Sequence, residues 1–450
     1  MRKIKFKCRE CGYISSGYFG KCPNCDSWNT LEEVVEDNKI NSKSTKKVSK
    51  AEKLSLVESS NSSRIRTSFD EFNRVMGGGI IKDSISIITA KPGAGKSTLL
   101  LQISNDLAKM GYKVLYASGE ESETQIKSRG LRIEEEISEN FYVYSDNTLD
   151  NVIEEIDDIN PDLIVIDSIQ TFVLKEFTNR AGSPTQVMEC AYKMVDIAKN
   201  KKNPKMVFLV GQMTKDDELA GVRSLEHLVD TVLYIQSENT EELRSLISTK
   251  NRYGSTGEIG FFIMTDKGLE SLDNPSEYFM TLRDENVTGS ALCVIKEGTR
   301  PIILEVEALA SNSFLPYPSR ISESISKDNL NTLISILEQR ADIRLNEKNI
   351  VVKSAGGMKL KEPSSNLAII MAIYSSAKKI PIPTDTVFIG DVGLTGEIKN
   401  VPSLLSRLKE IDRMGFKKVF IPRVSIDERE FKNIKLIKVK NILEVMNNLD

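Results

Sequence analysis

The chain has 450 residues, of which 40% are hydrophobic and 28% are charged, and its formal net charge at pH 7 is -3. This length exceeds one ordinary core and favours two or three domains, and the composition is typical of a soluble globular protein. No uninterrupted apolar run approaches the roughly 20 residues that a membrane-spanning helix needs, and the basic start MRKIKFKCRECGY is not followed by the apolar stretch of a secretory signal. We therefore expect a cytoplasmic protein with no membrane partner, and the small net charge decides nothing about nucleic acid.

Four cysteines near the N-terminus have the spacing of a structural metal site. Cys8, Cys11, Cys22 and Cys25 form the pattern C-x2-C-x10-C-x2-C. Two such pairs can place four thiolates around one tetrahedral Zn2+, which is the closed, structural arrangement. The alternative is two disulfides, which a reducing cytosol disfavours. Cys190 and Cys293 are isolated, and we interpret them as buried small hydrophobic residues.

The composition divides the rest of the chain into segments. We place the zinc finger at residues 1–31 and a flexible linker at 32–63, where NKINSKSTKKVSK carries five lysines and no acid. An ATP-hydrolysing α/β domain is predicted at 64–273 and a second, α+β domain at 274–450. Basic and aromatic residues within the zinc module suit a nucleic-acid backbone or a protein partner equally well, and a solvated basic surface is the third possibility.

A nucleotide-binding loop is predicted from the stretch ITAKPGAGKSTLL, residues 88–100. It nearly matches G-x-x-x-x-G-K-[ST], but Ala90 stands where the first glycine belongs. A β-rich apolar run precedes the loop and helical spacing follows it, which is the order that the motif requires. Because alanine is tolerated where φ stays negative, we expect ATP binding to survive. The residues predicted to bind ATP are Gly93, Ala94, Gly95, Lys96, Ser97 and Thr98, with Lys96 also catalytic and the Ser97 hydroxyl a Mg2+ ligand.

Three later strands end in side chains suited to ATP hydrolysis. KVLYASGEES ends in Glu120 and Glu121, PDLIVIDSI in Asp167, and KMVFLVGQM in Gln212. The carboxyl ends of parallel strands meet at one edge of a sheet, so these groups should face the phosphates. Asp167 is predicted to hold Mg2+ together with Ser97, a glutamate to polarise the attacking water, and Gln212 to sense the γ-phosphate.

The pattern then changes to strands without intervening helices. TVLYIQSE, LRSLISTK and EIGFFIM predict an antiparallel extension of the sheet. Between the last two lies KNRYG, which comprises Lys250, Asn251, Arg252, Tyr253 and Gly254. Its two cations cannot easily reach their own chain's phosphate loop. They could act on a neighbour's ATP, contact DNA, or form a solvated hairpin turn.

Taken together, these motifs resemble the bacterial RadA (Sms) family of recombination proteins. The resemblance rests on the four-cysteine module, PGAGKSTLL, SGEES, LIVIDSIQT, LEHLVD and KNRYG, and it covers nearly the whole chain. It implies a RecA-like P-loop ATPase core preceded by a small C4 zinc ribbon and followed by an α+β Lon-protease-like domain. It also implies a homohexamer that uses ATP, Mg2+ and structural Zn2+, binds single-stranded DNA and branched recombination intermediates, and works with a RecA-type recombinase.

Carried over by position, the resemblance ranks Glu120 above Glu121 as the catalytic glutamate and makes Lys250 and Arg252 the signature cations. Lys175, Arg180 and Lys215 are the candidates for contacts with DNA. The single histidine, His227, is expected to be structural, and Gln212 stands where the family often has histidine.

The C-terminal domain is expected to lack protease activity. ALCVIKEG and PIILEVEALA predict paired strands, and three helices are expected to alternate with TVFIGDVGL and KKVFIP. By resemblance to Lon, Ser364 falls on the position of the nucleophile and Arg407 on that of the base. Arginine is not deprotonated in proteins, so it cannot serve as that base. Ser364 is therefore interpreted as a helix N-terminal residue, and the domain as an assembly element whose Lys353, Lys359 and Lys361 offer basic surface to duplex DNA.

The leading hypothesis is a DNA-dependent ATPase motor that drives branch migration or D-loop extension. The alternative is an ATP-switched mediator that binds single-stranded DNA without translocating. An ATP-dependent protease is the third possibility, and the arginine at 407 disfavours it.

Overall fold

The computed structural model describes residues 4–11, 13–15, 17, 19–28, 30–35, 53, 64–212, 222–237, 242–281, 283, 285–314 and 317–449. It contains two compact units, Met1–Ser60 and Asn61–Asp450. Across the described residues, no helix is both long enough and apolar enough to cross a bilayer.

The N-terminal unit contains a three-stranded antiparallel sheet in the order β2-β1-β3. Its strands are β1 (Ile4–Cys8), β2 (Ile14–Ser15) and β3 (Leu31–Val35). β3 pairs with β1 along its whole length, so the module's sheet continues past residue 31, where the sequence analysis ends the module. The remainder of the predicted linker, apart from Lys53, lies outside the described residues.

The second unit begins with a nine-stranded sheet in the order β12-β11-β10-β9-β4-β8-β7-β5-β6. The six strands from β9 to β6 in this order are parallel, and β10, β11 and β12 are antiparallel. The strands are β4 (Ile85–Ala90), β5 (Val114–Ser118), β6 (Phe141–Ser145), β7 (Leu163–Asp167), β8 (Met206–Gln212), β9 (Thr231–Ser237), β10 (Leu243–Asn251), β11 (Ile259–Thr265) and β12 (Gly268–Ser271). One expectation was wrong: β9 is parallel to β4, because helix α6 precedes it, and the antiparallel extension begins only at β10.

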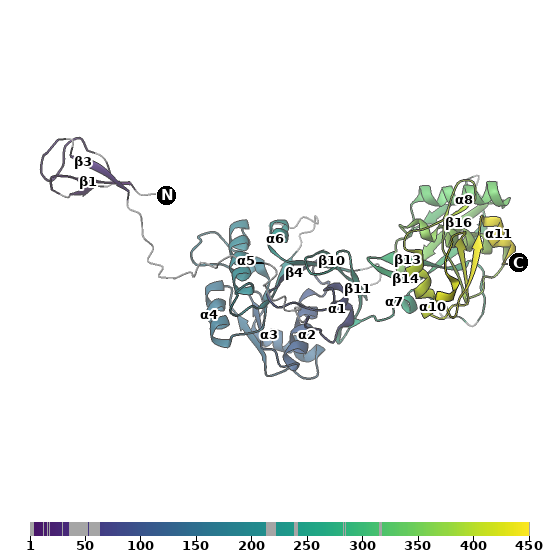
Figure 1. Ribbon diagram of the computed structural model, residues 1–450, viewed down its shortest axis with the longest axis horizontal. Coiled ribbons are helices and arrows are strands. Elements are labelled where there is room, and N and C mark those ends of the chain that lie inside the picture. Colours follow the sequence, from purple (N-terminus) through teal and green to yellow (C-terminus); the bar gives the residue numbers. More distant parts are fainter. Residues whose placement is uncertain are drawn as a thin grey trace. The chain divides into compact units, whose positions relative to one another are not determined.

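Helices cover both faces of this sheet (Figure 1). They are α1 (Asp70–Val75), α2 (Lys96–Lys109), α3 (Glu123–Ile133), α4 (Leu149–Ile159), the 3-10 turn η2 (Ile169–Thr171), α5 (Pro184–Ala198) and α6 (Val222–Leu228). Alternate strand residues face opposite sides: Val165 of β7 packs in one apolar cluster with α1, α2 and α3, while Ile164 and Ile166 pack in another with α4, α5 and α6. This is the doubly covered sheet expected of an α/β domain.

The C-terminal part of this unit contains a seven-stranded mixed sheet in the order β15-β16-β14-β13-β17-β20-β21 and a two-stranded sheet, β18-β19. The strands are β13 (Ser290–Glu297), β14 (Arg300–Asn312), β15 (Arg320–Ser322), β16 (Lys348–Ser354), β17 (Thr386–Phe388), β18 (Asp391–Val392), β19 (Ile398–Lys399), β20 (Lys418–Pro422) and β21 (Lys435–Val439). The helices are α7 (Pro275–Tyr278), α8 (Lys327–Ala341), η3 (Ala355–Gly357), η4 (Pro363–Ser365), α9 (Asn366–Lys378), α10 (Leu404–Arg413), η5 (Glu428–Glu430) and α11 (Ile442–Asn447). The predicted pairing of the two strands here is confirmed as the β13–β14 hairpin.

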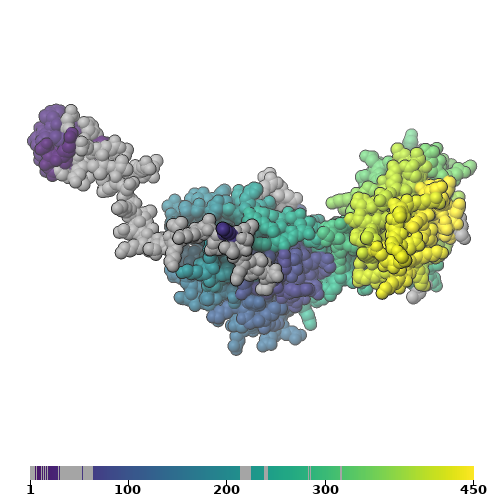
Figure 2. Space-filling view, in the orientation of Figure 1, coloured from purple at the N-terminus to yellow at the C-terminus, as the bar shows by residue number. Residues whose placement is uncertain are grey.

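An apolar core continues from the first sheet into the C-terminal part. Leu243 of β10 and Phe261 of β11 belong to the same buried cluster as the core residues of β13, β14 and α9. Phe261 also meets Phe279 edge to face, with ring centroids 5.8 Å apart. The predicted domain boundary between residues 273 and 274 falls within this continuous core, and it stays a prediction. Figure 2 shows the surface in the same sequence colours.

Candidate nucleotide site and zinc site

The phosphate loop follows a fully buried strand, and the strand explains why alanine is acceptable at position 90. All six residues of β4 are buried. Ala90 is still part of the strand, since it pairs with Gln212 of β8 on one side and Ile235 of β9 on the other. Among the described non-glycine residues with positive φ, Ala90 does not occur. An alanine therefore occupies this extended position without backbone strain.

The loop ends at a glycine that no other residue can replace without displacement. Gly95 precedes α2 with φ +100°, and a Cβ there would lie 2.7 Å from Met264 Cε and 3.1 Å from Leu269 Cδ1. Its left-handed conformation turns the chain into α2, so that Lys96, Ser97 and Thr98 form the first turn. The free N–H groups and the positive end of the helix dipole are thereby directed toward the loop, which suits a phosphate.

Lys96 is poised to receive an anion. Its side chain is buried, and Nζ donates a hydrogen bond to the carbonyl oxygen of Ala90 at 3.1 Å. Burial lowers the pKa of Lys96, and the carboxylates of Asp167 and Glu120 only partly oppose that effect. The carboxylates of the chain thus do not fully offset the cost of burying the positive charge of Lys96. A bound polyphosphate would supply the missing negative charge.

Asp167 ends β7 in the position predicted for the Mg2+ ligand. Its side chain is buried and accepts a hydrogen bond from the hydroxyl of Tyr116, on the neighbouring strand β5. Burial raises the pKa of Tyr116 well above its ordinary value, and the nearby Asp167 adds to this effect. Tyr116 therefore stays a donor to the carboxylate. Sequence reasoning missed this tyrosine, which lies in the middle of the mostly apolar strand VLYAS.

Glu120 and Glu121 have different partners, and this difference separates their possible roles. Glu120 accepts hydrogen bonds from Gln212 Nε2, at 2.9 Å, and from the hydroxyl of Ser168. These contacts connect the carboxyl ends of β5, β7 and β8. Glu121 instead forms an ion pair with Arg129 of α3, at 2.7 Å.

The structure therefore brings Lys96, Asp167, Glu120 and Gln212 to one edge of the sheet, and it directs Glu121 toward α3. The ranking of Glu120 above Glu121 is consistent with this geometry and remains a prediction. Ser168 and Arg129 were not identified from the sequence.

The KNRYG turn lies at the opposite edge of the same sheet. Asn251, at the end of β10, pairs with Thr231 of β9, and Thr231 pairs with Ser86 near the start of β4. The phosphate loop leaves the other end of β4, after Ala90. The expectation that these cations cannot reach their own chain's loop therefore agrees with the register of the strands.

Both cations of the turn are bound by groups of their own chain. Arg252 forms an ion pair with the buried carboxylate of Asp230 at 2.9 Å, although half of the arginine side chain is exposed. Lys250 Nζ donates to the carbonyl oxygens of Glu226 and, at 2.9 Å, of Val229. Burial lowers the pKa of Lys250, and the neighbouring Arg252 adds to this effect. The turn is thus held by specific contacts, which distinguishes it from a freely solvated hairpin.

Two of the three residues predicted to contact DNA lie in the part of the chain that the structure describes. Lys175 and Arg180 are both exposed in the segment between η2 and α5, and Lys175 Nζ also donates to Asn151 Oδ1 at 2.8 Å. Lys215 lies outside the described residues. His227 is exposed at the end of α6.

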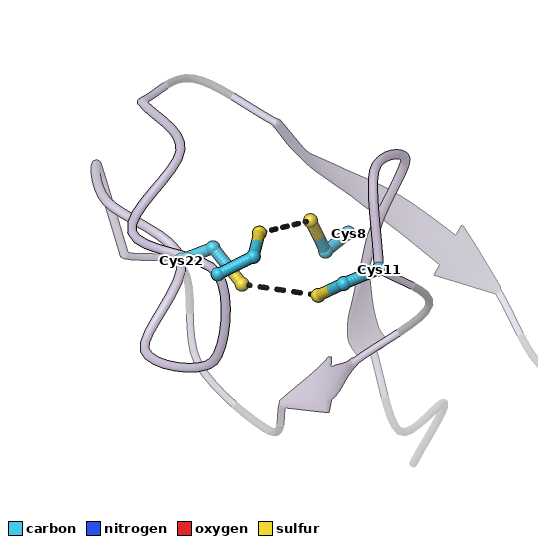
Figure 3. Close-up of side chains that lie close together, drawn as sticks. Cys8, Cys11 and Cys22 are labelled. Atoms are coloured by element: carbon cyan, nitrogen blue, oxygen red, sulfur yellow. Dashed lines mark hydrogen bonds between the residues drawn. The ribbon is translucent and has the colours of Figure 1, made fainter.

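The four N-terminal cysteines converge as a tetrahedral metal site requires (Figure 3). The Sγ atoms of Cys8 and Cys25 are 3.6 Å apart, as are those of Cys11 and Cys22, and all four lie within 4.8 Å of one another. Four sulfurs around Zn2+ at about 2.3 Å would be separated by about 3.8 Å, so the set fits this ion. Cys190 is fully buried among the residues that pack α4, α5 and α6 on the first sheet, and Cys293 is fully buried in the C-terminal core, as predicted. Burial raises the pKa of each to about 12.

In the C-terminal domain, Ser364 and Arg407, which occupy the positions of the Lon nucleophile and base, lie close together. Ser364 is buried in η4, directly before α9, and its hydroxyl donates to Val294 O at 3.3 Å and lies 3.1 Å from Glu362 Oε2. Arg407 is 1% exposed, and its guanidinium donates to the same Val294 carbonyl and to Glu362 Oε2, the latter at 2.7 Å. Ser364 thus lies directly before a helix, although the N-cap of α9 is Ser365, and its structural role stays a prediction. Arg407 is engaged in an ion pair with Glu362.

Comparison with known proteins assigns three segments to families. Residues 6–33 match the rubredoxin metal binding domain, residues 51–218 the AAA domain, and residues 321–425 the subunit ChlI of Mg-chelatase. The chain is 40% identical over 449 residues to DNA repair protein RadA of Listeria monocytogenes, covering 99% of this chain and 98% of the relative. It is 41% identical over 451 residues to DNA repair protein RadA of Bacillus subtilis, with the same coverage. The RadA protein of Streptococcus pyogenes serotype M1 is 40% identical over 450 residues, again at 99% and 98%.

Proposed function

The chain belongs to the RadA family of DNA repair proteins, and on this premise we propose that it is a DNA-dependent ATPase of homologous recombination and recombinational repair. The proposed form is a homohexameric motor that drives branch migration or D-loop extension on single-stranded DNA. A RecA-type recombinase is the proposed protein partner.

The location of the KNRYG turn is the observation that supports the proposal of a motor. It lies at the edge of the sheet opposite to its own phosphate loop, so its cations can act on ATP only if a second subunit presents its loop to them. An ATPase site that is incomplete within one chain requires an assembly. Such an assembly allows hydrolysis in one subunit to move its neighbour.

The nucleotide site supplies the remaining groups. Lys96 binds the β- and γ-phosphates, while the Ser97 hydroxyl and Asp167 are the proposed ligands of Mg2+, which neutralises charge on the phosphates. Tyr116 orients the Asp167 carboxylate. Glu120 is proposed to accept the proton of the attacking water, and Gln212, bonded to Glu120, connects this base to the γ-phosphate position.

A mixing experiment tests the shared site. Lys96→Ala removes the loop cation and Arg252→Ala removes the turn cation, so each variant should be inactive when alone. In a mixture, the loop of an Arg252→Ala subunit meets the intact turn of a Lys96→Ala subunit, and ATP hydrolysis should return. Lys199→Ala is the matched control, because Lys199 also pairs with Asp230 at 2.9 Å but lies outside the turn. If no mixing ratio restored hydrolysis, the trans assignment would fail, and contact with DNA would become the role of the turn.

A branch-migration assay separates the motor from its alternative. A mediator that switches with ATP would bind single-stranded DNA and hydrolyse ATP, but it would not move a DNA junction. The motor should convert a labelled four-way junction to products only when ATP is hydrolysed, and the Lys96→Ala protein should not.

The C-terminal Lon-like domain is proposed to support assembly without protease activity. The guanidinium of Arg407 cannot accept a proton, so the base of a protease dyad is missing at this position. The carboxylate 3.1 Å from the Ser364 hydroxyl, that of Glu362, is engaged in the ion pair with Arg407. Lys353, Lys359 and Lys361 are all exposed and are the proposed contacts with duplex DNA, although Lys353 also pairs with Glu307 at 3.2 Å. Casein that stays intact beside an active ATPase preparation would support this reading, and processive degradation would overturn it.

A further inference from the structure

A buried ion pair joins the C-terminal domain to the ATPase domain. Arg300, at the start of β14, donates from Nη1 to both carboxylate oxygens of Glu71, at 2.7 and 2.9 Å. Its Nη2 donates to the carbonyl oxygen of Asp273 at 2.6 Å. The side chains of Glu71 and Arg300 are only 3% and 11% exposed. Such a pair has a fixed geometry, because both groups are removed from water and hydrogen-bonded on several sides.

Glu71 belongs to α1, and this short helix extends from the ion pair to the KNRYG turn. At the far end of α1, the carbonyl oxygen of its last residue, Val75, accepts a hydrogen bond from Asn251 Nδ2 at 3.4 Å, and that of the following Met76 accepts one from Arg64 Nη1 at 3.2 Å. Arg64 also donates from Nη2 to the carbonyl oxygen of Tyr253. The helix is therefore bonded to Arg300 near one end and directly to Asn251 of the turn at the other, and Arg64 connects Met76, which follows the helix, to Tyr253.

Backbone contacts reinforce both ends of this path. A Cβ on Gly254 would lie 3.1 Å from the Cα of Gly77, so the turn packs directly on the chain that follows α1. The tip of the β13–β14 hairpin reaches the same loop: a Cβ on Gly298 would lie 2.0 Å from the carbonyl oxygen of Gly257. Gly257 is only three residues beyond the turn. The C-terminal domain thus contacts the turn's loop by a second, direct route.

The carboxylate of Glu71 also fixes the strand behind the turn. Its Oε2 accepts a hydrogen bond from the backbone N–H of Phe261 in β11, at 2.9 Å. Phe261 in turn packs on Phe279 in the core that the C-terminal domain shares with the first sheet. A displacement of the β13–β14 hairpin would therefore pull on α1, on β11 and on the loop between β10 and β11 together.

From these contacts we propose that α1 is a connector between the C-terminal domain and the KNRYG turn, and that Arg300 is a positioning residue for Lys250 and Arg252. Through these contacts, the C-terminal domain determines where Lys250 and Arg252 lie. The same contacts transmit any nucleotide-dependent movement of the turn to the C-terminal domain. The catalytic consequence rests on the function proposed above, whereas the mechanical link does not.

The matched control is a second buried arginine–glutamate pair within the C-terminal domain. Arg283 binds the buried carboxylate of Glu305, which also accepts a backbone N–H, from Thr281 at 2.9 Å. This pair resembles the Arg300–Glu71 pair in burial and bonding but has no contact with α1 among the described residues. Arg283→Ala therefore reproduces the loss of a buried ion pair without breaking the connector.

Hydrogen exchange on the full-length chain tests the proposal directly. In Arg300→Ala, the amides of residues 250–257 should exchange at least about tenfold faster than in the wild type, while those of α2 are unchanged. Glu71→Gln should have a smaller effect in the same segment, because it keeps the amide oxygen as an acceptor. Arg283→Ala should leave the turn unchanged. Equal exchange at 250–257 in Arg300→Ala and in the wild type, or equal acceleration in Arg300→Ala and Arg283→Ala, would overturn the connector.

ATP hydrolysis provides the second readout. Arg300→Ala should lower the DNA-stimulated kcat severalfold with the KM for ATP unchanged, since the chain's own phosphate loop is intact. If the wild type showed no stimulation by DNA, the proposed function would fail, and the exchange result would still decide the mechanical link. Faster exchange at the turn with an unchanged kcat would overturn the assignment of Arg300 as a positioning residue.

Discussion

Glu120 and Glu121 are adjacent but have different partners, and replacing each of them in turn by glutamine tests which one is the catalytic base. Glutamine keeps the side-chain oxygen, so at position 120 it can still accept from Gln212 and Ser168, and the network across the strand ends should persist. What it loses is the ability to accept a proton from water. Removal of a general base typically costs about 10²- to 10⁴-fold in rate, which corresponds to about 2.7–5.4 kcal/mol of transition-state stabilisation.

At position 121 the same change affects only the ion pair with Arg129. The two side chains are 35% and 18% exposed, so solvent screens their interaction and its loss should cost about 1 kcal/mol of stability or less. The rate of hydrolysis should stay within about fivefold of the wild type, because in the proposed mechanism no step uses this carboxylate.

The assay is steady-state ATP hydrolysis at saturating ATP and fixed salt, with nucleotide binding measured separately by a fluorescent ATP analogue. Both variants should bind the analogue like the wild type, so that any loss is assigned to the chemical step. A larger loss of kcat in Glu121→Gln than in Glu120→Gln would refute the assignment.

Four further predictions follow from individual contacts. Ala90→Gly should leave ATP affinity unchanged and cost about 0.5–1 kcal/mol of stability, because position 90 is an extended strand residue; a gain in affinity on titration with ATP would contradict this. Lys96→Met should raise the melting temperature without nucleotide at pH 7.5, and its advantage should shrink as the pH approaches 10.5. The reason is that burial lowers the pKa of Lys96, so over that range the unfolded chain binds more protons than the folded one and the wild type gains stability as the pH rises; a difference independent of pH would argue otherwise. Cys22→Ser should unfold the zinc module while calorimetry finds the melting of residues 61–450 unchanged, since the two units are separately compact. Arg407→Ala should destabilise the C-terminal domain by about 3 kcal/mol in urea unfolding, because it removes a fully buried side chain and leaves Glu362 without its cationic partner; a loss below about 1 kcal/mol would mean that the pair contributes little.

The strands that form the nucleotide site could be predicted because buried parallel strands appear in a sequence as continuous apolar runs. LIVID and ISIITA are of this kind, and both are fully buried. β6, with the sequence FYVYS, was missed because it is a partly exposed edge strand without such a run. The direction of β9 was mistaken because the preceding helix, α6, is short and has a weak pattern.

The polar partners of the site could not be predicted, because they are brought together only by the fold. Tyr116 and Asp167 are 51 positions apart in sequence, and Glu71 and Arg300 are 229 apart. Their pairing depends on strand order and on domain docking, neither of which a local motif specifies. Motifs identified the residues that are predicted to contact nucleotide or metal, and the structure was needed to find the groups that orient them.

The central claim is that ATP hydrolysis at Lys96 is coupled to DNA through the KNRYG turn. Its most direct test is steady-state ATP hydrolysis at fixed salt, with and without single-stranded DNA, by the wild type, Lys96→Ala and Arg252→Ala. Stimulation by DNA that both substitutions abolish is the predicted result. Hydrolysis that is indifferent to DNA in the wild type, or stimulation that survives in Arg252→Ala, would contradict the account.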